Sequence, residues 1–306
     1  MTDAPKALRM GQQEWLLLIL LSVMWGASFF FYKVMTQELP PITIVLGRLG
    51  IAAIVLNLIV VARGERLSFP ARTWPRIALL AIINNALPFT LIATSETRIT
   101  SSLAAIVSAT TPILTAITAH MLTHDEKLRW NKAVGIAVGF VGAAIVIGGD
   151  VLEGLGSQDL IGELICLAAS VSYAFSGVYS RHFHHLAPLK VATAQVTAGA
   201  LILLPIALVV DQPWTLPMPS APVWGSLLGI ALMGTALAYL LFFRIVGRIG
   251  ASNMSLVAFL QPVSALLLGW IGLGEIVSWQ ALAGMGVIAL GMALIDGRPL
   301  GYLRRA

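Results

Sequence analysis

Two basic residues, Lys33 and Arg48, stand inside long apolar stretches of the sequence. A charge at the centre of a membrane helix costs about 2.5–3.5 kcal/mol on insertion scales, so such residues usually have a function. Their ammonium and guanidinium groups could both bind the carboxylate of a small molecule through charge-assisted hydrogen bonds. Each also has a structural alternative: Lys33 could extend to the lipid headgroups, and Arg48 could pair with backbone carbonyl groups.

Neutral polar residues and two prolines occur in the middle of other apolar stretches. A proline inside a helix frees a backbone carbonyl group about four residues earlier, which a membrane tolerates only where protein or a water-filled cavity satisfies it. Pro112 and Pro262 are each preceded by polar side chains, so we predict two helix breaks beside a central cavity. The alternative for each polar residue is a hydrogen bond that only joins two helices. The predicted cavity residues are Trp25, Lys33, Arg48, Asn84, Asn85, Thr110, Thr111, Tyr173, Ser176, Tyr239 and Gln261.

The composition indicates which elements must hold these residues. Hydrophobic residues make up 58% of the chain and charged residues only 11%, and the mean hydropathy is +0.89, far from the values of a soluble globular domain. The apolar stretches have the length of about 20 residues that a helix needs to cross a membrane, rather than the roughly 10 residues of a barrel strand. We therefore predict an all-α integral membrane protein with ten transmembrane helices. The expected spans are residues 14–34, 41–61, 75–94, 101–121, 130–149, 160–181, 190–210, 222–242, 251–271 and 279–296.

The two halves of the chain repeat one pattern. At an offset of 150, Ile99, Ser102 and Pro112 match Ile249, Ser252 and Pro262, and at an offset of 149, Glu126, Trp130, Gly135 and Gly142 match Glu275, Trp279, Gly284 and Gly291. Because each repeat has an odd number of helices, five, the two halves must enter the membrane from opposite faces. Inverted-topology repeats of this kind are typical of secondary transporters, in which they support alternating access.

The basic residues indicate the orientation. Of the 19 Lys and Arg residues, all but Lys33, Arg48 and Arg98 fall in the terminal segments or in the loops and helix ends on one face of the predicted bundle. Since Lys and Arg are retained preferentially on the cytoplasmic side, we expect both termini in the cytoplasm of a multi-pass protein of the inner (plasma) membrane. The first span is longer than the apolar core of a signal peptide and has no small-residue cleavage site, so it is expected to remain as a helix.

Four segments carry a resemblance to a known family. They are WGASFFFYK (Trp25 to Lys33), RLGIAAIVL (Arg48 to Leu56), IGASNMSLVAFLQP (Ile249 to Pro262) and LGEIVSWQALAGMGVIALG (Leu273 to Gly291). The chain resembles the EamA-type members of the drug/metabolite transporter superfamily over essentially its whole length. The second half matches better, because the first reads THDEKLRW where the family has a leucine-glycine-glutamate. The resemblance implies a ten-helix exporter of small metabolites, often amino acids. The expected organisation is a cytoplasmic segment at 1–13, EamA-like repeats at 14–149 and 160–296, and a basic cytoplasmic tail at 297–306.

Other functional classes fit the sequence less well. The catalytic groups of a membrane enzyme would gather in the membrane, whereas each of the 5 histidines is expected at or beyond a helix end and no carboxylate at mid-depth. We therefore expect no enzyme and no cofactor. The single cysteine, Cys166, and the loop cluster of His182, His184 and His185 give no metal-ligand pattern, so we expect no metal. Basic residues are spread over several loops, which disfavours a nucleic-acid partner. A receptor or scaffold that binds without transport stays open.

The expected partners are a small-molecule substrate and the lipid bilayer. Aromatic residues beside Lys33 and Arg48 favour an amphipathic metabolite such as an amino acid, aromatic ones included; nucleosides, polyamines and xenobiotics are the alternatives. Without an acid at mid-depth, we expect uniport or exchange rather than proton coupling, with Glu163 the nearest candidate. The glycine spacings Gly135–Gly139 and Gly225–Gly229 could join helices within a monomer or between the protomers of a homodimer.

Overall fold

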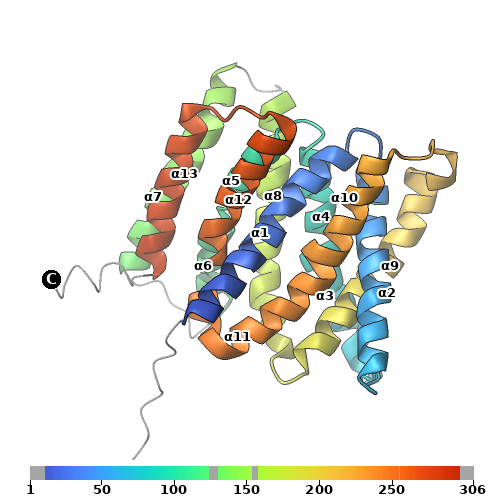
Figure 1. Cartoon of the computed structure of the whole chain (residues 1–306). Helices are drawn as coiled ribbons and strands as arrows, with labels where there is room; N and C mark the ends of the chain where they lie inside the picture. Colours follow the sequence, from blue (N-terminus) through green and yellow to red (C-terminus); the bar gives the residue numbers. More distant parts are fainter. Residues whose placement is uncertain (1–10, 124–129, 154–157, 255, 297–306) are drawn as a thin grey trace, which may run out of the picture.

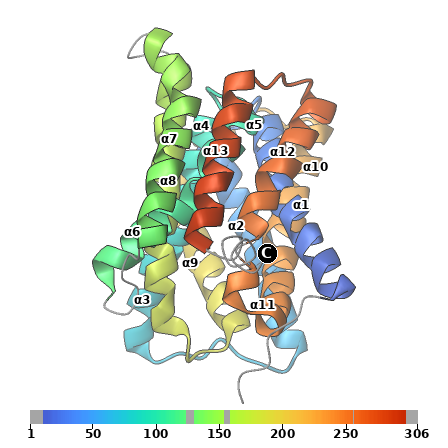
Figure 2. The same cartoon turned by 90° about the vertical axis from the view of Figure 1, so that its left-hand side faces the viewer.

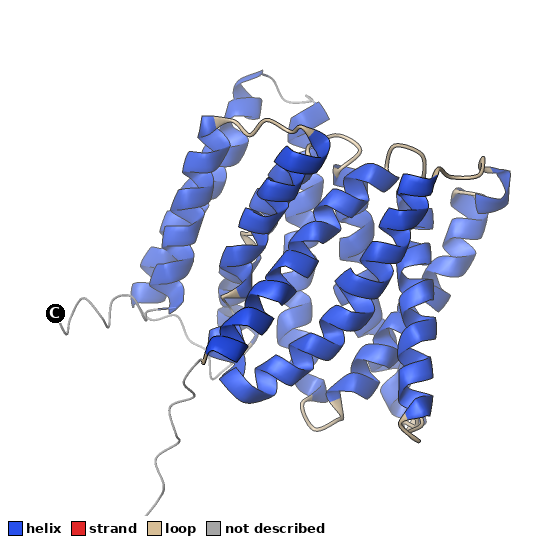
Figure 3. Cartoon of the chain, viewed as in Figure 1, coloured by secondary structure: helices blue, strands red, loops and turns tan. Residues whose placement is uncertain are grey.

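The structure is a computed structural model that describes residues 11–123, 130–153, 158–254 and 256–296. Every regular element in these ranges is helical, as Figure 3 shows. Within the described ranges, seven helical segments are long and apolar enough to cross a membrane, and three further apolar helices are shorter. The prediction of an all-α membrane protein is therefore confirmed.

The helices lie side by side in one bundle (Figures 1 and 2). In chain order they are α1 (Gln12–Met35), α2 (Pro41–Ala62), α3 (Trp74–Ala81), α4 (Leu87–Ser95), α5 (Ser101–Ser108), α6 (Thr111–Leu122), α7 (Trp130–Glu153), α8 (Gln158–Tyr179), α9 (Pro188–Val210), α10 (Ala221–Ala231), α11 (Ala238–Met254), α12 (Val257–Leu273) and α13 (Trp279–Asp296). Short 3-10 turns stand at Ala71–Thr73 (η1), Ser180–Phe183 (η3) and Pro213–Thr215 (η4).

The connections define two ends of the bundle. We name the end at which α1 begins the Gln12 end, and the opposite one, which carries the loops at residues 36–40, 96–100, 211–220 and 274–278, the Glu275 end. The loops at residues 63–70 and 180–187 lie at the Gln12 end, together with the start of α9.

Two of the long segments contain a π-helical turn that the hydrophobic pattern did not predict. The turn η2 (Ile82–Ala86) joins α3 to α4, and η5 (Leu232–Leu237) joins α10 to α11. A π turn widens the helix by one residue and is common at functional sites. Here η2 carries the two asparagines Asn84 and Asn85 into the bundle.

The boundary between the eighth and ninth expected spans differs from the prediction. Helix α11 continues to Met254, and α12 begins at Val257 rather than near residue 251. The stretch from Arg244 to Met254 contains no proline, so nothing in it stops the preceding helix. The polar segment of the repeat motif therefore belongs to the end of α11.

Helices α7 and α13 form a closely packed pair at one edge of the bundle (Figure 1). A Cβ atom added to Gly291 would lie 2.6 Å from the backbone nitrogen of Gly139 and 2.7 Å from the carbonyl oxygen of Gly135. These glycines therefore permit backbone contact within one chain, as in other small-residue helix pairs. In the second glycine spacing, Gly225–Gly229, Gly229 faces the ring of Phe31, whereas Gly225 has open space beside it.

Candidate functional site

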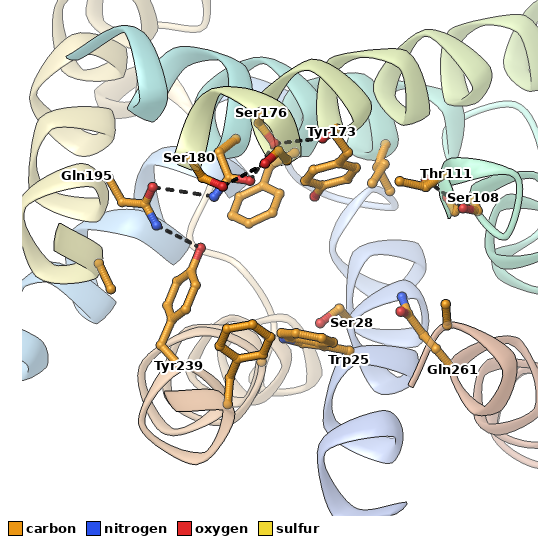
Figure 4. A pocket seen from close by; sticks show the side chains of 18 of the residues that line it. Trp25, Ser28, Ser108, Thr111, Tyr173, Ser176, Ser180, Gln195, Tyr239 and Gln261 are labelled. Carbon is orange, nitrogen blue, oxygen red and sulfur yellow. Dashed lines mark hydrogen bonds between the residues drawn. The ribbon is translucent and has the colours of Figure 1, made fainter. Parts of the chain in front are cut away.

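A cavity of about 670 Å³ lies inside the bundle. Figure 4 shows Trp25, Tyr173 and Tyr239 around its open centre, with polar groups between them. Every helix except α7, α10 and α13 contributes to the lining. The lining reaches the exposed residues Ser180 and His184 at the Gln12 end, but it includes no residue of the Glu275-end loops. As far as the described residues define it, the cavity therefore extends toward the Gln12 end and not toward the Glu275 end.

Arg48 supplies the charge in this cavity and is 4% exposed. Its Nε donates to Thr235 Oγ1 at 2.9 Å and its Nη1 to Tyr32 Oη at 2.8 Å. The guanidinium carbon stands 3.7 Å from the ring centroid of Phe89, a cation–π contact. In the described part of the chain no carboxylate forms a salt bridge with Arg48. The guanidinium is thus held in place by neutral groups, with donor capacity left for a ligand, because it carries five N–H groups.

A chain of polar side chains lines one wall of the cavity (Figure 4). Ser176 donates to Asn84 Oδ1 at 2.9 Å, and Asn84 donates to Gln195 Oε1 at 3.4 Å. Gln195 in turn donates to Tyr239 Oη at 3.3 Å. These groups join η2, α8, α9 and α11 around the cavity. They give it neutral donors and acceptors that can orient a substrate without adding charge.

The two prolines line the cavity on the side of α6 and α12. The chain leaves the α-helix between α5 and α6, so a break directly precedes Pro112. Helix α12 instead runs without interruption through Pro262, which differs from the predicted break; the chain changes direction earlier, between α11 and α12. Gln261 projects from α12 toward Thr111 across the cavity (Figure 4).

The comparisons with known proteins concern almost the whole chain. A model of the EamA-like transporter family matches it twice, over residues 13–148 and 160–296. The chain belongs to the EamA-like transporter family. Among similar proteins, the uncharacterized transporter YoaV of Bacillus subtilis is 24% identical over 276 residues, covering 90% of this chain and 94% of that protein. The uncharacterized inner membrane transporter YedA of Escherichia coli is 25% identical over 280 residues, covering 91% and 89%.

A probable terminal-alkyne amino-acid exporter of Streptantibioticus cattleyicolor is 25% identical over 307 residues, covering 98% of each chain. A solved crystal structure covers 93% of this chain and 96% of its own, with a TM-score of 0.65 at 18% identity. That likeness establishes the fold. Together with the family match, it makes this chain a multi-pass membrane protein of a transporter family.

Three of the predicted cavity residues in this EamA-like chain do not line the cavity. Lys33 lies at the Glu275 end, where its Nζ donates to the carbonyl oxygens of Glu96 and Ile99, both at 2.8 Å. Asn85 is fully buried behind the wall and donates to Tyr239 Oη at 3.2 Å. Thr110 donates to Val107 O within its own turn. The cavity is lined by the remaining predicted residues, Trp25, Arg48, Asn84, Thr111, Tyr173, Ser176, Tyr239 and Gln261.

The sequence did not reveal several lining residues. Gln195 lies in α9, in an expected span without a mid-helix break. Its polar side chain within an apolar helix was an available signal, of the same kind that selected Gln261. Other lining residues that were missed include Ser28, Phe29, Tyr32, Ser108, Phe242 and Phe243.

The Glu275 end is closed by acidic side chains that accept hydrogen bonds from backbone N–H and hydroxyl groups at helix N-termini. Glu275 accepts from the backbone nitrogens of Ser101 and Ser102 at 2.8 and 2.9 Å, and from their hydroxyl groups at 3.0 and 2.6 Å. Asp211 accepts from both the nitrogen and the hydroxyl of Thr43, at 2.7 and 2.9 Å.

Glu38 likewise accepts from the nitrogen and the hydroxyl of Ser220, at 2.7 and 2.5 Å. Each of these three contacts connects one family-matched half to the other. Carboxylates are favourable at helix N-termini, where backbone N–H groups lack partners. The contacts therefore hold the two halves together at this end.

Proposed function

We propose that this chain is a secondary transporter that exports small amphipathic carboxylates, amino acids foremost, by alternating access. The proposed architecture is ten transmembrane helices in two inverted five-helix repeats, at 14–149 and 160–296, between the terminal segments 1–13 and 297–306. Both termini lie in the cytoplasm, so the Glu275 end faces outward. The cavity then opens toward the cytoplasm, where an exporter takes up its substrate.

One observation carries the choice of substrate: Arg48 is a buried cation in an aromatic-lined cavity, without a carboxylate partner in the described residues. A buried charge is stable only when it is paired or well hydrogen-bonded, so an anionic group on the substrate complements it. The aromatic rings of Trp25, Tyr173 and Phe242 suit an apolar or ring-bearing remainder.

The relative from Streptantibioticus cattleyicolor, which is named as an amino-acid exporter, supports the same substrate class. Nucleosides and uncharged xenobiotics are the alternatives, because the wall of Asn84, Gln195 and Tyr239 could bind them without using Arg48. Polyamines and other cations fit least well, since Arg48 repels them.

The test is exchange transport by purified protein in liposomes, with panels of labelled amino acids, nucleosides and polyamines. We expect exchange of an amino acid that falls at least about tenfold in Arg48→Gln, since one lost charge-assisted hydrogen bond contributes roughly 1.5–3 kcal/mol. Arg48→Lys should be intermediate, because an ammonium keeps the charge but not the planar face that lies on Phe89. Arg72→Gln is the matched control, because Arg72 is exposed and outside the cavity.

Thermal unfolding of each variant is measured in parallel, so that transport is compared at equal amounts of folded protein. Amino-acid exchange by Arg48→Gln at the native rate would contradict the role of Arg48. Failure of every compound to exchange would favour a receptor or scaffold that binds without transport.

The proposed orientation has a separate test with single cysteines. A membrane-impermeant thiol reagent should label Arg66→Cys from the cytoplasmic side and Glu38→Cys from the outside. The reverse pattern would overturn the orientation.

A further inference from the structure

Glu96 is a buried acid that the proposed transport function does not use. It lies in the loop between α4 and α5, outside the apolar spans, at the Glu275 end. The residue is 0% exposed, and neither carboxyl oxygen has a hydrogen-bond partner among the described residues. An ionised carboxylate in such a place costs far more than a neutral carboxylic acid. Burial therefore raises the pKa of Glu96 well above its ordinary value.

Charged groups on α1 and just beyond α12 act on the carboxyl group of Glu96. The ammonium of Lys33 on α1 lowers the pKa, but its hydrogen bonds go to the main-chain oxygens of Glu96 and Ile99 rather than to the carboxyl group. The carboxylate of Glu275, just beyond α12, raises the pKa. Glu96 also interacts electrostatically with Tyr32 of α1 and Cys166 of α8, and Glu163 of α8 in turn interacts with Cys166.

We propose that Glu96 is a proton-binding site whose occupancy is tied to the closure of the Glu275 end. The inference rests on the proposed alternating access, because it requires that this end opens. In the closed arrangement the carboxyl group holds a proton. When the end opens, water reaches Glu96, its pKa returns toward about 4.3, and the proton passes to that water. Closing the end again takes up one proton.

The sign of the pH dependence follows from the raised pKa. The closed state binds one more proton than the open state at every pH between the two pKa values of Glu96. The ratio of closed to open molecules therefore falls about tenfold for each unit of rising pH in that window. Acid on this side favours closure.

The contact between Glu38 and Ser220 responds to pH in a different range, and in the opposite direction: acid weakens this contact, whereas acid favours closure through Glu96. Hydrogen bonds from the side chain and backbone of Ser220 lower the pKa of Glu38. Its contact with Ser220 is therefore present above its ordinary pKa and is lost only as the pH falls through the lowered value. The two effects can be separated, because the Glu96 window begins at the ordinary carboxyl pKa and extends upward.

This site would make transport depend on pH even though the sequence predicts no acid at mid-depth. An exporter that releases substrate at the open Glu275 end would take up a proton there before it closes. The proton enters and leaves at this same end, so no proton crosses the membrane: transport stays uncoupled from a proton gradient, but its rate depends on the pH at the Glu275 end.

The test measures opening of the Glu275 end directly. Thr97 and Ile276 are exposed residues of the loops that carry Glu96 and follow Glu275. Spin labels at Thr97→Cys and Ile276→Cys, in a Cys166→Ala background and in lipid nanodiscs, report the distance between the two loops from about pH 5 to pH 8.5. We expect the open population to rise about tenfold per pH unit in part of this range.

The variant Glu96→Gln keeps the shape of a neutral carboxyl group and should stay closed at every pH. Asp159→Asn, an exposed acid in the first turn of α8, is the matched control and should keep the native pH response. An unchanged pH response in Glu96→Gln would overturn the proposal. If the two spin-labelled loops never move apart in the protein with native Glu96, at any pH or with any exported amino acid, alternating access and this inference with it would instead be overturned.

Infrared spectroscopy provides a second measurement should Glu96→Gln fail to fold. The native protein at neutral pH should show the carbonyl band of a buried, protonated carboxylic acid. Loss of that band on raising the pH should accompany opening of the spin-labelled loops. Absence of the band at neutral pH would overturn the proposal without any Glu96 variant.

Discussion

The contact of Glu275 with the start of α5 predicts how firmly one end of the transporter is closed. The carboxylate is 9% exposed and accepts four hydrogen bonds, two from backbone nitrogens and two from the hydroxyl groups of Ser101 and Ser102. Three of the four reach one oxygen, Oε2. In Glu275→Gln, an amide oxygen placed there keeps those three contacts, while the amide nitrogen cannot accept the fourth.

The free-energy change can be worked out from these contacts. Loss of one hydrogen bond to a charged group costs roughly 1.5–3 kcal/mol, and loss of a negative charge at a helix N-terminus about 0.3–1 kcal/mol more. The closed arrangement should therefore lose about 2–4 kcal/mol relative to the open one. Since each 1.4 kcal/mol is a factor of ten, the equilibrium for closure should fall by roughly 30-fold to 1,000-fold.

The assay is thiol labelling of a cavity residue from the side of the Glu275 end. Ser28 lines the cavity, so Ser28→Cys should react with a membrane-impermeant reagent from that side only while the end is open. Glu275→Gln should accelerate this reaction strongly, and Ser102→Ala, which removes a single hydroxyl contact, should have a smaller effect. Thr97→Ala, in an exposed loop position at the same end, is the control. Equal labelling rates in the native protein and Glu275→Gln would refute the reasoning.

Three further predictions follow from single sites. Gly291→Ala should lower the thermal stability by about 1–3 kcal/mol through overpacking against α7, whereas Gly286→Ala, with open space beside it, should be neutral or slightly stabilising in the same melting experiment. Gln261→Leu should weaken substrate binding in calorimetry while leaving the melting temperature nearly unchanged; normal binding with lost stability would show that Gln261 only joins helices. Cross-linking of Glu38→Cys to Ser220→Cys should trap the closed end at any pH. In the native protein the Glu38–Ser220 contact should be lost only in acid, below the ordinary pKa of Glu38, and hydrogen exchange of the Ser220 amide would report that loss.

The helices were predictable from the sequence because the thickness of the membrane sets the length of the apolar stretch that a helix needs to cross it. Arg48 could be identified for a related reason: a charge in such a stretch is costly enough to be informative. Lys33 met the same criterion, yet its ammonium binds carbonyl groups of Glu96 and Ile99, which lie more than 60 residues away in the chain. The cost of a charge indicates that a partner exists but not which one.

The π turns and the path of the chain near Pro262 could not be predicted for a different reason. A π turn at Ile82–Ala86 uses the same residues as an α-helix, so the hydrophobic period hardly changes. The turn nevertheless matters for the site, because Asn84 lies on it and there forms hydrogen bonds with Ser176 of α8 and Gln195 of α9. The position of a helix break near Pro262 depends on the packing of α12 against α1, which no local pattern contains.

The contacts of Arg48 suggest how the substrate could open the Glu275 end. A ligand shifts a conformational equilibrium only by its difference in affinity for the two states. In the closed arrangement the guanidinium of Arg48 on α2 is bound to Tyr32 of α1 and to Thr235 of η5. A substrate carboxylate that binds the remaining N–H groups would draw the guanidinium away from these two partners, so its binding would loosen the attachment of α2 to both neighbours.

Tyr32 immediately precedes Lys33, which holds the Glu96 loop at the closed end. We therefore infer that Tyr32 connects substrate binding to opening, and Tyr32→Phe isolates this step, because it removes the hydroxyl group from Arg48 while the ring stays in place. If the inference holds, the spin-labelled loops in Tyr32→Phe should respond less to the substrate while their pH response persists. A substrate response of native size would show that the signal passes through Thr235 and η5 instead.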